Sequence, residues 1–250
     1  MTATAAGPLI AVINPNSSEV ITQALERNLA GPTTSPSSSF SLRLAFHTGP
    51  PAAPPSINNP IDAVTSAAHT FASLSFSSSS SAAEESDAFL VCCFSNHPLA
   101  AMLRHAHPSK PTMHILEAAV LHALPLCTRF GVITTGADAV PDIDRGIRDV
   151  LGANSYRYIG TLATGLGVVE LQTGDQAKVQ STLQQHAAKL AEMGADAIIL
   201  GCAGMTGMEA IVRQGAQSAL KPGKQVAVID GCKAGVQLLA GLAACRYFGP

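Results

Sequence analysis

The two halves of this chain repeat one pattern of short apolar segments. Three pairs of segments match: residues 10–15 (IAVINP) with 130–135 (FGVITT), 87–93 (DAFLVCC) with 196–202 (DAIILGC), and 112–117 (TMHILE) with 225–230 (QVAVID). The separations are 120, 109 and 113 residues, and serine-rich insertions in the first half account for the longer first value. An internal repeat of this length predicts two similar structural units.

The apolar runs alternate with segments of helical periodicity. Strands are predicted at residues 9–13, 42–47, 88–93, 130–134, 157–159, 197–201 and 226–229. Helices are predicted at residues 18–30, 59–71, 98–104, 117–124, 141–150, 176–193, 207–215 and 232–248. Fully apolar strands of about five residues are typical of parallel sheets that are covered on both faces.

We therefore predict an α/β fold of two pseudo-symmetric Rossmann-like lobes with parallel sheets and an active site in the cleft between them. The first lobe is expected to contain residues 8–118 and 222–250, so that the C-terminal strand and helix return to it. The second lobe is expected to contain residues 119–221. Residues 32–41 and 73–86, which are rich in serine, are expected to be surface loops. The proline-rich run 49–55 is expected to be a connector or a pocket wall.

Composition excludes several classes of protein. The chain has 15 Lys and Arg against 17 Asp and Glu, without a basic run, so a nucleic-acid partner is not expected. Its longest apolar stretch, residues 236–245, is too short to cross a membrane, and its N-terminus has no export signal. We expect a cytoplasmic protein whose six cysteines are reduced thiols.

The repeat places one cysteine at an equivalent strand end in each half. Ligands of open parallel sheets bind beyond the carboxyl ends of the strands, and Cys93 and Cys202 occupy those ends. If the lobes face each other about a pseudo-twofold axis, the two thiols meet across one cleft. Each cysteine precedes a predicted helix, whose N–H groups are expected to lower the thiol pKa. Two thiols on opposite sides of a substrate form a two-base device for moving a proton.

Six segments carry a resemblance to a known family. They are residues 13–18 (INPNSS), 93–98 (CFSNHP), 117–119 (EAA), 131–135 (GVITT), 200–205 (LGCAGM) and 228–231 (VIDG). In this order they resemble the aspartate/glutamate/hydantoin racemase superfamily, and within it the hydantoin racemase branch with its fungal members. The resemblance runs from residue 10 to about residue 239.

The resemblance implies a racemase or epimerase that needs no cofactor and no metal. In it, Cys93 and Cys202 remove and return a proton at an acidic carbon next to a carbonyl. The implied small-molecule substrate is a hydantoin or a related cyclic ureide such as allantoin, and the implied assembly is a homo-oligomer. The substrate contacts carried over from the family are Asn16, Ser17, Ser95, Asn96, Thr134, Thr135, Gly201, Ala203 and Gly204. Backbone amides near Gly201 to Gly204 are expected to stabilise enolate charge.

Several residues have two interpretations. Asn96 stands where many hydantoin racemases carry an aspartate, which bears on substrate preference. His97 either tunes Cys93 or caps a helix. Glu117 and Asp230 either orient groups in the cleft or cap the helices that follow them. Cys232 follows the strand end at Asp230 and Gly231. It is therefore either a structural cysteine or a further residue of the cleft lining.

Two other functions are compatible with the same cleft. One is an isomerase or lyase of the maleate isomerase or decarboxylase type, recruited to specialised biosynthesis. Two retained thiols argue against a decarboxylase that uses one, and a covalent cysteine adduct would identify the isomerase. The other is a ligand-binding protein without catalysis, which two thiols among small polar residues make the weakest of the three hypotheses.

Overall fold

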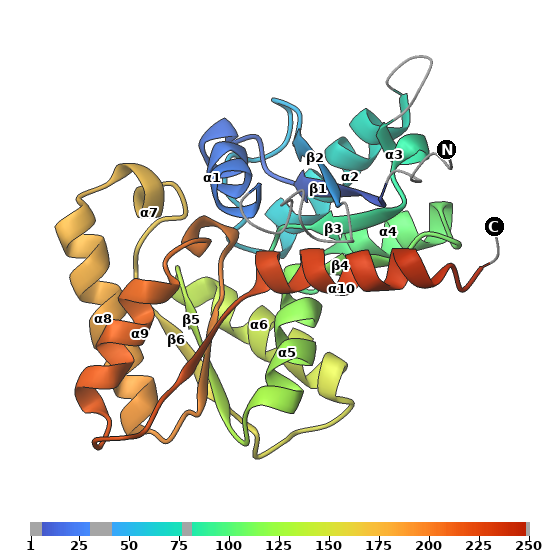
Figure 1. Cartoon of the computed structure of the whole chain (residues 1–250). Coiled ribbons are helices and arrows are strands. Elements are labelled where there is room, and N and C mark those ends of the chain that lie inside the picture. Colours follow the sequence, from blue (N-terminus) through green and yellow to red (C-terminus); the bar gives the residue numbers. More distant parts are fainter. Residues whose placement is uncertain (1–6, 31–41, 77–81, 249–250) are drawn as a thin grey trace, which may run out of the picture.

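The fold is built on two parallel sheets with the same strand order. The computed structural model describes residues 7–30, 42–76 and 82–248, and within them each sheet has four strands. The first sheet, in the order β2-β1-β3-β4, contains β1 (Leu9–Asn14), β2 (Arg43–Thr48), β3 (Ala88–Val91) and β4 (Thr112–His114). The second, in the order β6-β5-β7-β8, contains β5 (Phe130–Thr134), β6 (Tyr158–Ala163), β7 (Ala197–Leu200) and β8 (Ala227–Asp230). The predicted two-lobed α/β architecture is confirmed (Figure 1).

Helices cover both faces of each sheet. Those of the first lobe are α1 (Glu19–Leu29), α2 (Pro60–Phe76), α3 (Ala82–Glu85) and α4 (Pro98–Ala106). Those of the second lobe are α6 (Val140–Leu151), α7 (Glu170–Thr173), α8 (Gln176–Glu192) and α9 (Glu209–Ala219), with the short 3₁₀ turns η2 (Ala137–Ala139) and η3 (Ala203–Met205). Two further helices, α5 (Ile115–Leu126) and α10 (Gly231–Cys245), connect the lobes.

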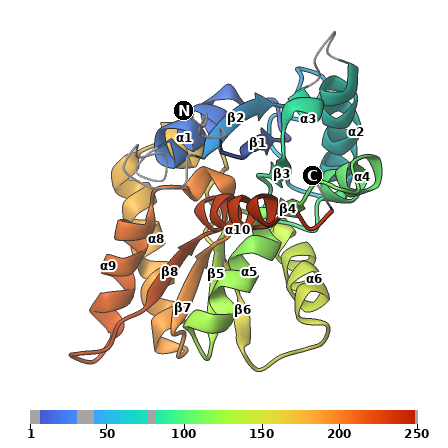
Figure 2. The same cartoon turned by 45° about the vertical axis from the view of Figure 1, so that its right-hand side comes forward.

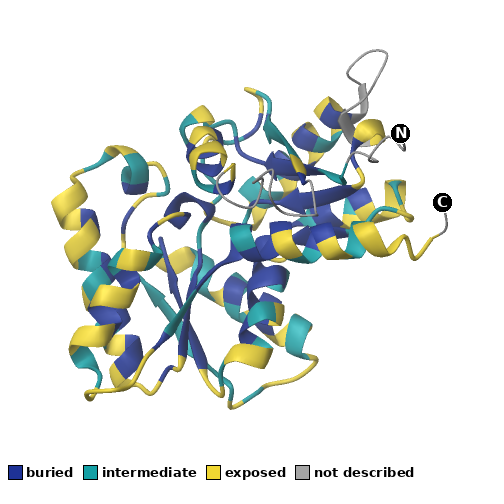
Figure 3. Cartoon of the chain, viewed as in Figure 1, coloured by how far each residue is buried: buried dark blue, intermediate teal, exposed yellow. Residues whose placement is uncertain are grey.

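Alternate residues of each central strand enter different cores, because successive side chains of a strand point to opposite faces. In β1, Ile10 and Val12 join a central core that continues through both lobes. Ala11 and Ile13 instead pack with residues of α2 and α4. The second sheet divides in the same way between the central core and a core beneath α8 and α9. Both faces of the central strands are therefore buried (Figure 3).

The two connecting helices are exchanged between the lobes. Helix α5 follows β4 of the first sheet but packs against β7 and β8 of the second. Helix α10 follows β8 of the second sheet but packs against β3 and β4 of the first, and it crosses between the lobes in Figures 1 and 2. The helices meet where they begin, because a Cβ on Gly231 would lie 2.6 Å from the carbonyl oxygen of Ile115. Glycine is required there by this close approach.

The C-terminal strand corrects one prediction. Residues 226–229 were expected to return to the first lobe, but β8 pairs in parallel with β7 in the second sheet. The reason is the symmetry of the repeat, in which β8 is the counterpart of β4. Each of these strands forms the edge of its own sheet, next to the strand that precedes the cysteine. Only the helix after β8 lies against the first sheet.

The serine-rich segment 73–86 is partly helical rather than a loop. Helix α2 continues to Phe76, and residues 82–85 form α3. Ala67, Phe71 and Leu74 share one face of α2 and pack into the core of the first lobe, which extends the helix past the expected end. Residues 77–81 and the predicted loop 32–41 lie outside the described residues. None of the described helices has the length and apolar character to span a bilayer.

Candidate active site

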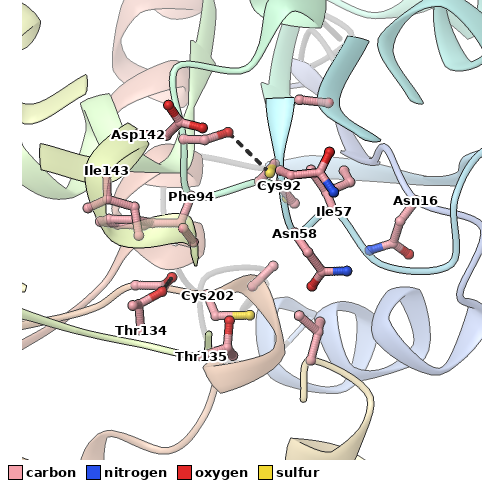
Figure 4. Close-up of a pocket in the computed structure, with 18 of the residues that line it drawn as sticks. Asn16, Ile57, Asn58, Cys92, Phe94, Thr134, Thr135, Asp142, Ile143 and Cys202 are labelled. Atoms are coloured by element: carbon pink, nitrogen blue, oxygen red, sulfur yellow. Dashed lines mark hydrogen bonds between the residues drawn. The ribbon is translucent and has the colours of Figure 1, made fainter. Parts of the chain in front are cut away.

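A cavity that is partly open to solvent, with about 670 Å³ of empty space, lies between the lobes at the carboxyl ends of β1, β3, β5 and β7. It is lined by Asn16, Ile21, Ile57, Asn58, Asn59, Ala63, Cys92, Cys93, Phe94, Ser95, Thr134, Thr135, Ala139, Asp142, Ile143, Val168, Gly201, Cys202 and Ala203. The amides of Asn16 and Asn58 lie on one side of it, and Asp142, Ile143 and Phe94 lie on the other (Figure 4). Segments from both lobes therefore form its wall.

Cys93 follows β3 and opens into the cavity. Its sulfur is 3.3 Å from Oγ of Ser95, within hydrogen-bonding distance. Burial raises the thiol pKa to about 12; the bond with Ser95 offsets part of that rise, and Cys202 and Cys92 add to it. A thiolate at Cys93 is therefore a strong base, and it is costly to form.

Cys202 follows β7 and is the N-cap of η3. Its sulfur accepts a hydrogen bond from the N–H of Gly204 at 3.3 Å. Burial raises this thiol pKa to about 11, against the lowering effect of the backbone N–H groups of Gly204 and Met205. Cys202 is thus the more easily ionised of the two thiols.

Both pKa values correct the expectation of acidified thiols. Helix α4 begins at Pro98, as predicted, with His97 as its cap, but the one influence that lowers the pKa of Cys93 is the Ser95 hydroxyl rather than a helix N–H group. At Cys202 the N–H groups are present, but desolvation outweighs them. Both cysteines are half-buried residues that line the cavity.

The turn after β7 positions Cys202 through close backbone packing. The N–H of Gly201 donates to the carbonyl oxygen of Ile133 at 2.7 Å, and the hydroxyl of Thr134 donates to the carbonyl oxygen of Gly201 at 3.1 Å. A Cβ on Gly201 would lie 2.7 Å from the Ile133 oxygen. Only glycine lets the strand end pass this close to β5, so the residue at 201 sets the position of the thiol after it.

Polar side chains surround the two thiols. Oδ1 of Asn16 accepts from the N–H of Ser18 at 2.9 Å, and Oδ1 of Asn58 accepts from Oγ of Ser56 at 3.0 Å. Nδ2 of Asn16 and the hydroxyl of Thr135 have no hydrogen-bond partner among residues 7–30, 42–76 and 82–248. These two donors are available to a ligand with carbonyl oxygens.

Comparison with known proteins decides the family. A family model described as Asp/Glu/Hydantoin racemase matches residues 10–239. The chain belongs to this family. An uncharacterized protein of Schizosaccharomyces pombe is 35% identical over 240 residues, with 96% of this chain and 93% of that protein covered. A hydantoin racemase of Rhizobium meliloti is 32% identical over 161 residues, with 64% and 62% covered.

Solved structures agree with this assignment. An allantoin racemase from Klebsiella pneumoniae superimposes with a TM-score of 0.76 at 25% identity, with 96% of this chain and 89% of that chain covered. Membership of the Asp/Glu/hydantoin racemase family makes the protein an isomerase of the racemase type.

Most of the family contacts predicted from the sequence do lie at the cavity of this racemase. Cys93, Cys202, Asn16, Ser95, Thr134, Thr135, Gly201 and Ala203 all line it.

Ser17, Asn96 and Gly204 do not line the cavity. The N–H of Ser17 donates to the carbonyl oxygen of Pro54 at 3.1 Å, which fixes the proline-rich connector. Nδ2 of Asn96 donates to Asp149 at 3.2 Å, away from the thiols. Gly204 contributes its N–H to Cys202 rather than to the cavity. The amides of Gly201 and Gly204 are thus already engaged and are not free to hold enolate charge.

His97 has the helix-capping role. Its Nδ1 accepts from the N–H of Leu99 at 3.3 Å, and its Nε2 lies 3.0 Å from Oγ of Ser66 in α2. With Nδ1 accepting, Nε2 carries the proton and donates to Ser66. Burial, assisted by His114, lowers the pKa of His97 to about 4. This neutral histidine joins the segment after Cys93 to α2 and does not line the cavity.

Glu117 caps a helix and lies outside the cavity lining. It forms a capping box with His114 at the start of α5 and an ion pair of 2.6 Å with Arg104.

Asp230 caps a helix and also holds the loop after Cys202. Its Oδ1 accepts from the N–H groups of Cys232 and Lys233 at the start of α10. Its Oδ2 accepts from the hydroxyl of Thr206 at 2.6 Å and from the N–H of Gly207 at 3.2 Å. Asp230 therefore acts on the site through the segment that carries Cys202.

The structure adds lining residues that sequence reasoning missed. Ile57, Asn58 and Asn59 follow the proline-rich run and line the cavity. The pocket wall predicted for residues 49–55 is therefore formed by the segment just after them.

Asp142 comes from the first turn of α6, the helix after β5. Its position beyond the end of a strand is the sequence feature that could have identified it. Cys232 is buried behind the cavity beside Cys92, which raises its pKa, and does not line it.

Proposed function

We propose that this protein is a cofactor-independent racemase of hydantoins or related cyclic ureides, and that Cys93 and Cys202 are its two bases. The observation that carries the proposal is the pair of thiols, one from each lobe, that line a single cavity. In one direction the Cys202 thiolate takes the C5 proton while the Cys93 thiol gives a proton to the opposite face. The reverse direction exchanges the two roles.

The electrostatics of the pair favour one thiolate and one thiol. A charge on Cys202 raises the pKa of Cys93, so the first ionisation opposes the second. Backbone N–H groups donate hydrogen bonds that stabilise a negative charge on Cys202. The hydrogen-bond partner of Cys93 is instead a hydroxyl group. On this difference we assign to Cys202 the thiolate that forms when one of the two thiols ionises.

The cavity wall supports a neutral ring as the substrate core. None of the lining residues in the described part of the chain is Lys, Arg or His, so a free amino-acid carboxylate would lack a cation to offset its burial. The Asn16 amide and the Thr135 hydroxyl are suited to ring carbonyls, where negative charge develops as C5 loses its proton. The ring carbonyl and imide acidify that proton, so thiol bases suffice.

The proposal is tested by following inversion and deuterium incorporation separately. Single enantiomers of 5-substituted hydantoins and of allantoin are incubated in deuterated water with wild type, Cys93→Ser and Cys202→Ser. The rate at which each variant inverts a single enantiomer should fall by about a thousandfold or more, which is the contribution expected of a general acid–base group. The remaining thiol can still exchange the proton on its own face, so the two variants should exchange opposite enantiomers without inverting them.

Cys245→Ser is the matched control, because Cys245 is an exposed thiol at the end of α10. It should racemise like wild type, and a blank without protein corrects for spontaneous racemisation. Normal inversion by either Cys93→Ser or Cys202→Ser would exclude the two-thiol mechanism. A stable covalent adduct on one cysteine, seen by mass spectrometry, would instead indicate the isomerase alternative.

The rate should depend steeply on pH. With the pKa of Cys202 near 11, roughly one thiol in ten thousand is ionised at pH 7 in the ligand-free site. We expect kcat/KM to rise about tenfold per pH unit from 7 to 9, after subtraction of the base-catalysed blank. A flat profile over this range would contradict a thiolate base with a raised pKa.

A further inference from the structure

One charged side chain stands out on the cavity wall. Asp142, in the first turn of α6, carries the only Asp, Glu, Lys or Arg side chain among the described lining residues. It lies across the cavity from the amides of Asn16 and Asn58 (Figure 4). The mechanism proposed above gives it no task, because neither thiol is hydrogen-bonded to it.

The charge of Asp142 is not neutralised from inside the cavity. Within the part of the chain that the structure describes, its one ion pair is with Arg145, at 3.3 Å from Nη2 to Oδ1. The Arg145 side chain is 66% exposed, whereas that of Asp142 is 28% exposed. An exposed pair of this kind contributes little, and it leaves Oδ2 able to accept hydrogen bonds from a ligand.

The surroundings of the carboxylate strengthen its effect on a ligand. Ile143 and Phe94 lie on the same side of the cavity and are both buried. Apolar walls lower the local dielectric response, so attraction and repulsion at this carboxylate exceed their values in water. A ligand group placed here is selected by its charge and its N–H donors.

We propose that Asp142 selects the substituent at C5 of the substrate, favouring groups rich in N–H donors or positively charged, such as ureido, carbamoyl, guanidino or ammonium groups, and rejecting carboxylates. The inference rests on the proposed function, because it assumes that the ring lies between the thiols. A carboxylate substituent meets a like charge without a cation on the wall. An N–H-bearing substituent meets a partly desolvated acceptor.

The position of Asn96 sharpens this assignment. From the sequence, Asn96, a neutral amide close after Cys93, was predicted to affect substrate preference. Its side chain instead bonds to Asp149 and does not line the cavity. The negative charge at this site therefore comes from α6 in the second lobe.

A pair of nearly isosteric substrates isolates the effect. Rates are compared for 5-(2-carbamoylethyl)hydantoin and 5-(2-carboxyethyl)hydantoin, with 5-isobutylhydantoin as an apolar reference. Wild type should prefer the carbamoyl compound to the carboxyl compound by about tenfold or more in kcat/KM. Asp142→Asn should reduce that preference to within about threefold and should change the isobutyl rate less than the rates of the two polar compounds.

Asp138→Asn is the matched control. Asp138 lies four residues before Asp142, is exposed, and does not line the cavity, so its variant removes the same charge from the same region. It should keep the wild-type preference. An Asp142→Asn variant with the wild-type preference, or one that slows all three substrates equally, would overturn the inference.

Binding separates this inference from the proposed function. If wild type accelerates none of the three hydantoins, the proposed function fails, and calorimetric affinities of the carbamoyl and carboxyl compounds then test Asp142 alone. A preference of wild type for the carbamoyl compound that Asp142→Asn loses would support its selective role. An equal preference in both proteins, or binding of neither compound, would overturn it.

Discussion

The two lobes present equivalent thiols but hold them with different groups. Cys93 and Cys202 follow the same strand of their respective sheets, β3 and β7. The first thiol is bonded to the Ser95 hydroxyl, and its pKa is the higher one. The second is bonded to the Gly204 backbone N–H. A repeated topology fixes where the thiols lie, and the turn after each strand decides how readily each one ionises.

The supports behind the two turns also differ. In the first lobe, the buried neutral His97 ties the segment after Cys93 to α2. In the second lobe, the carboxylate of Asp230 ties the segment after Cys202 to α10. One lobe depends on a group that must remain uncharged, and the other depends on a charged acceptor. Substitutions that separate these supports test whether the lobes differ in the way described.

The largest effect is expected on the second lobe. Asp230→Ala leaves four donors without their acceptor, among them the Thr206 hydroxyl and two N–H groups at the start of α10. Loss of a cap and of buried bonds to a charged group should cost about 2–4 kcal/mol of unfolding free energy. Because the loop after Cys202 is released, kcat/KM should also fall by more than about tenfold.

Thermal unfolding and steady-state kinetics together check this prediction. Asp196→Ala is the control: Asp196 accepts from the N–H groups of Thr128 and Arg129 and does not line the cavity. It should lower stability while kcat/KM is retained. Equal losses of activity in the two variants would show that Asp230 acts through general stability alone.

An intermediate effect is expected on the first lobe in acid. His97 and His114 each have a pKa of about 4 in the folded protein, chiefly through burial, against about 6.5 in an unfolded chain. The unfolded chain binds more protons between these values. The stabilisation is therefore complete above pH 6.5 and is lost as the pH falls from 6.5 to 4, by roughly 3 kcal/mol at most for each histidine.

Urea unfolding at pH 7 and pH 5 measures this loss. His97→Asn keeps a helix-capping side chain but does not titrate, so its stability should fall less between the two pH values than that of wild type. His105→Asn changes an exposed histidine of the same helix and should behave like wild type. The same acid sensitivity in all three proteins would show that His97 is not a source of it.

The smallest effect is expected at Ser95. Ser95→Ala removes the hydrogen bond that lowers the pKa of Cys93, so that pKa should rise further. One lost hydrogen bond corresponds to a decrease of about 2- to 10-fold in kcat/KM at neutral pH. Ser95→Thr keeps the hydroxyl and should retain more activity than Ser95→Ala. If the two variants are equally slow, the hydroxyl is not what matters at this position.

The sequence was informative where one local rule decides the outcome. Apolar strands with turn residues at their ends predicted parallel sheets, and the repeat of residues 87–93 at 196–202 predicted equivalent positions for Cys93 and Cys202. It was less informative where distant groups decide. The ionisation of the two thiols depends on burial, and the orientation of Asn96 depends on Asp149 in α6 of the other lobe.

The sequence by itself determined the two-lobed α/β plan, the strand ends that bear the thiols, and the family resemblance, because hydrophobic periodicity and motif order are properties of the chain alone. Only the tertiary structure decided that β8 joins the second sheet, that α5 and α10 are exchanged between the lobes, and that Asp142 lines the cavity. The physical reason is that pairing, packing and desolvation depend on which distant segments meet, and those contacts arise only in the folded molecule.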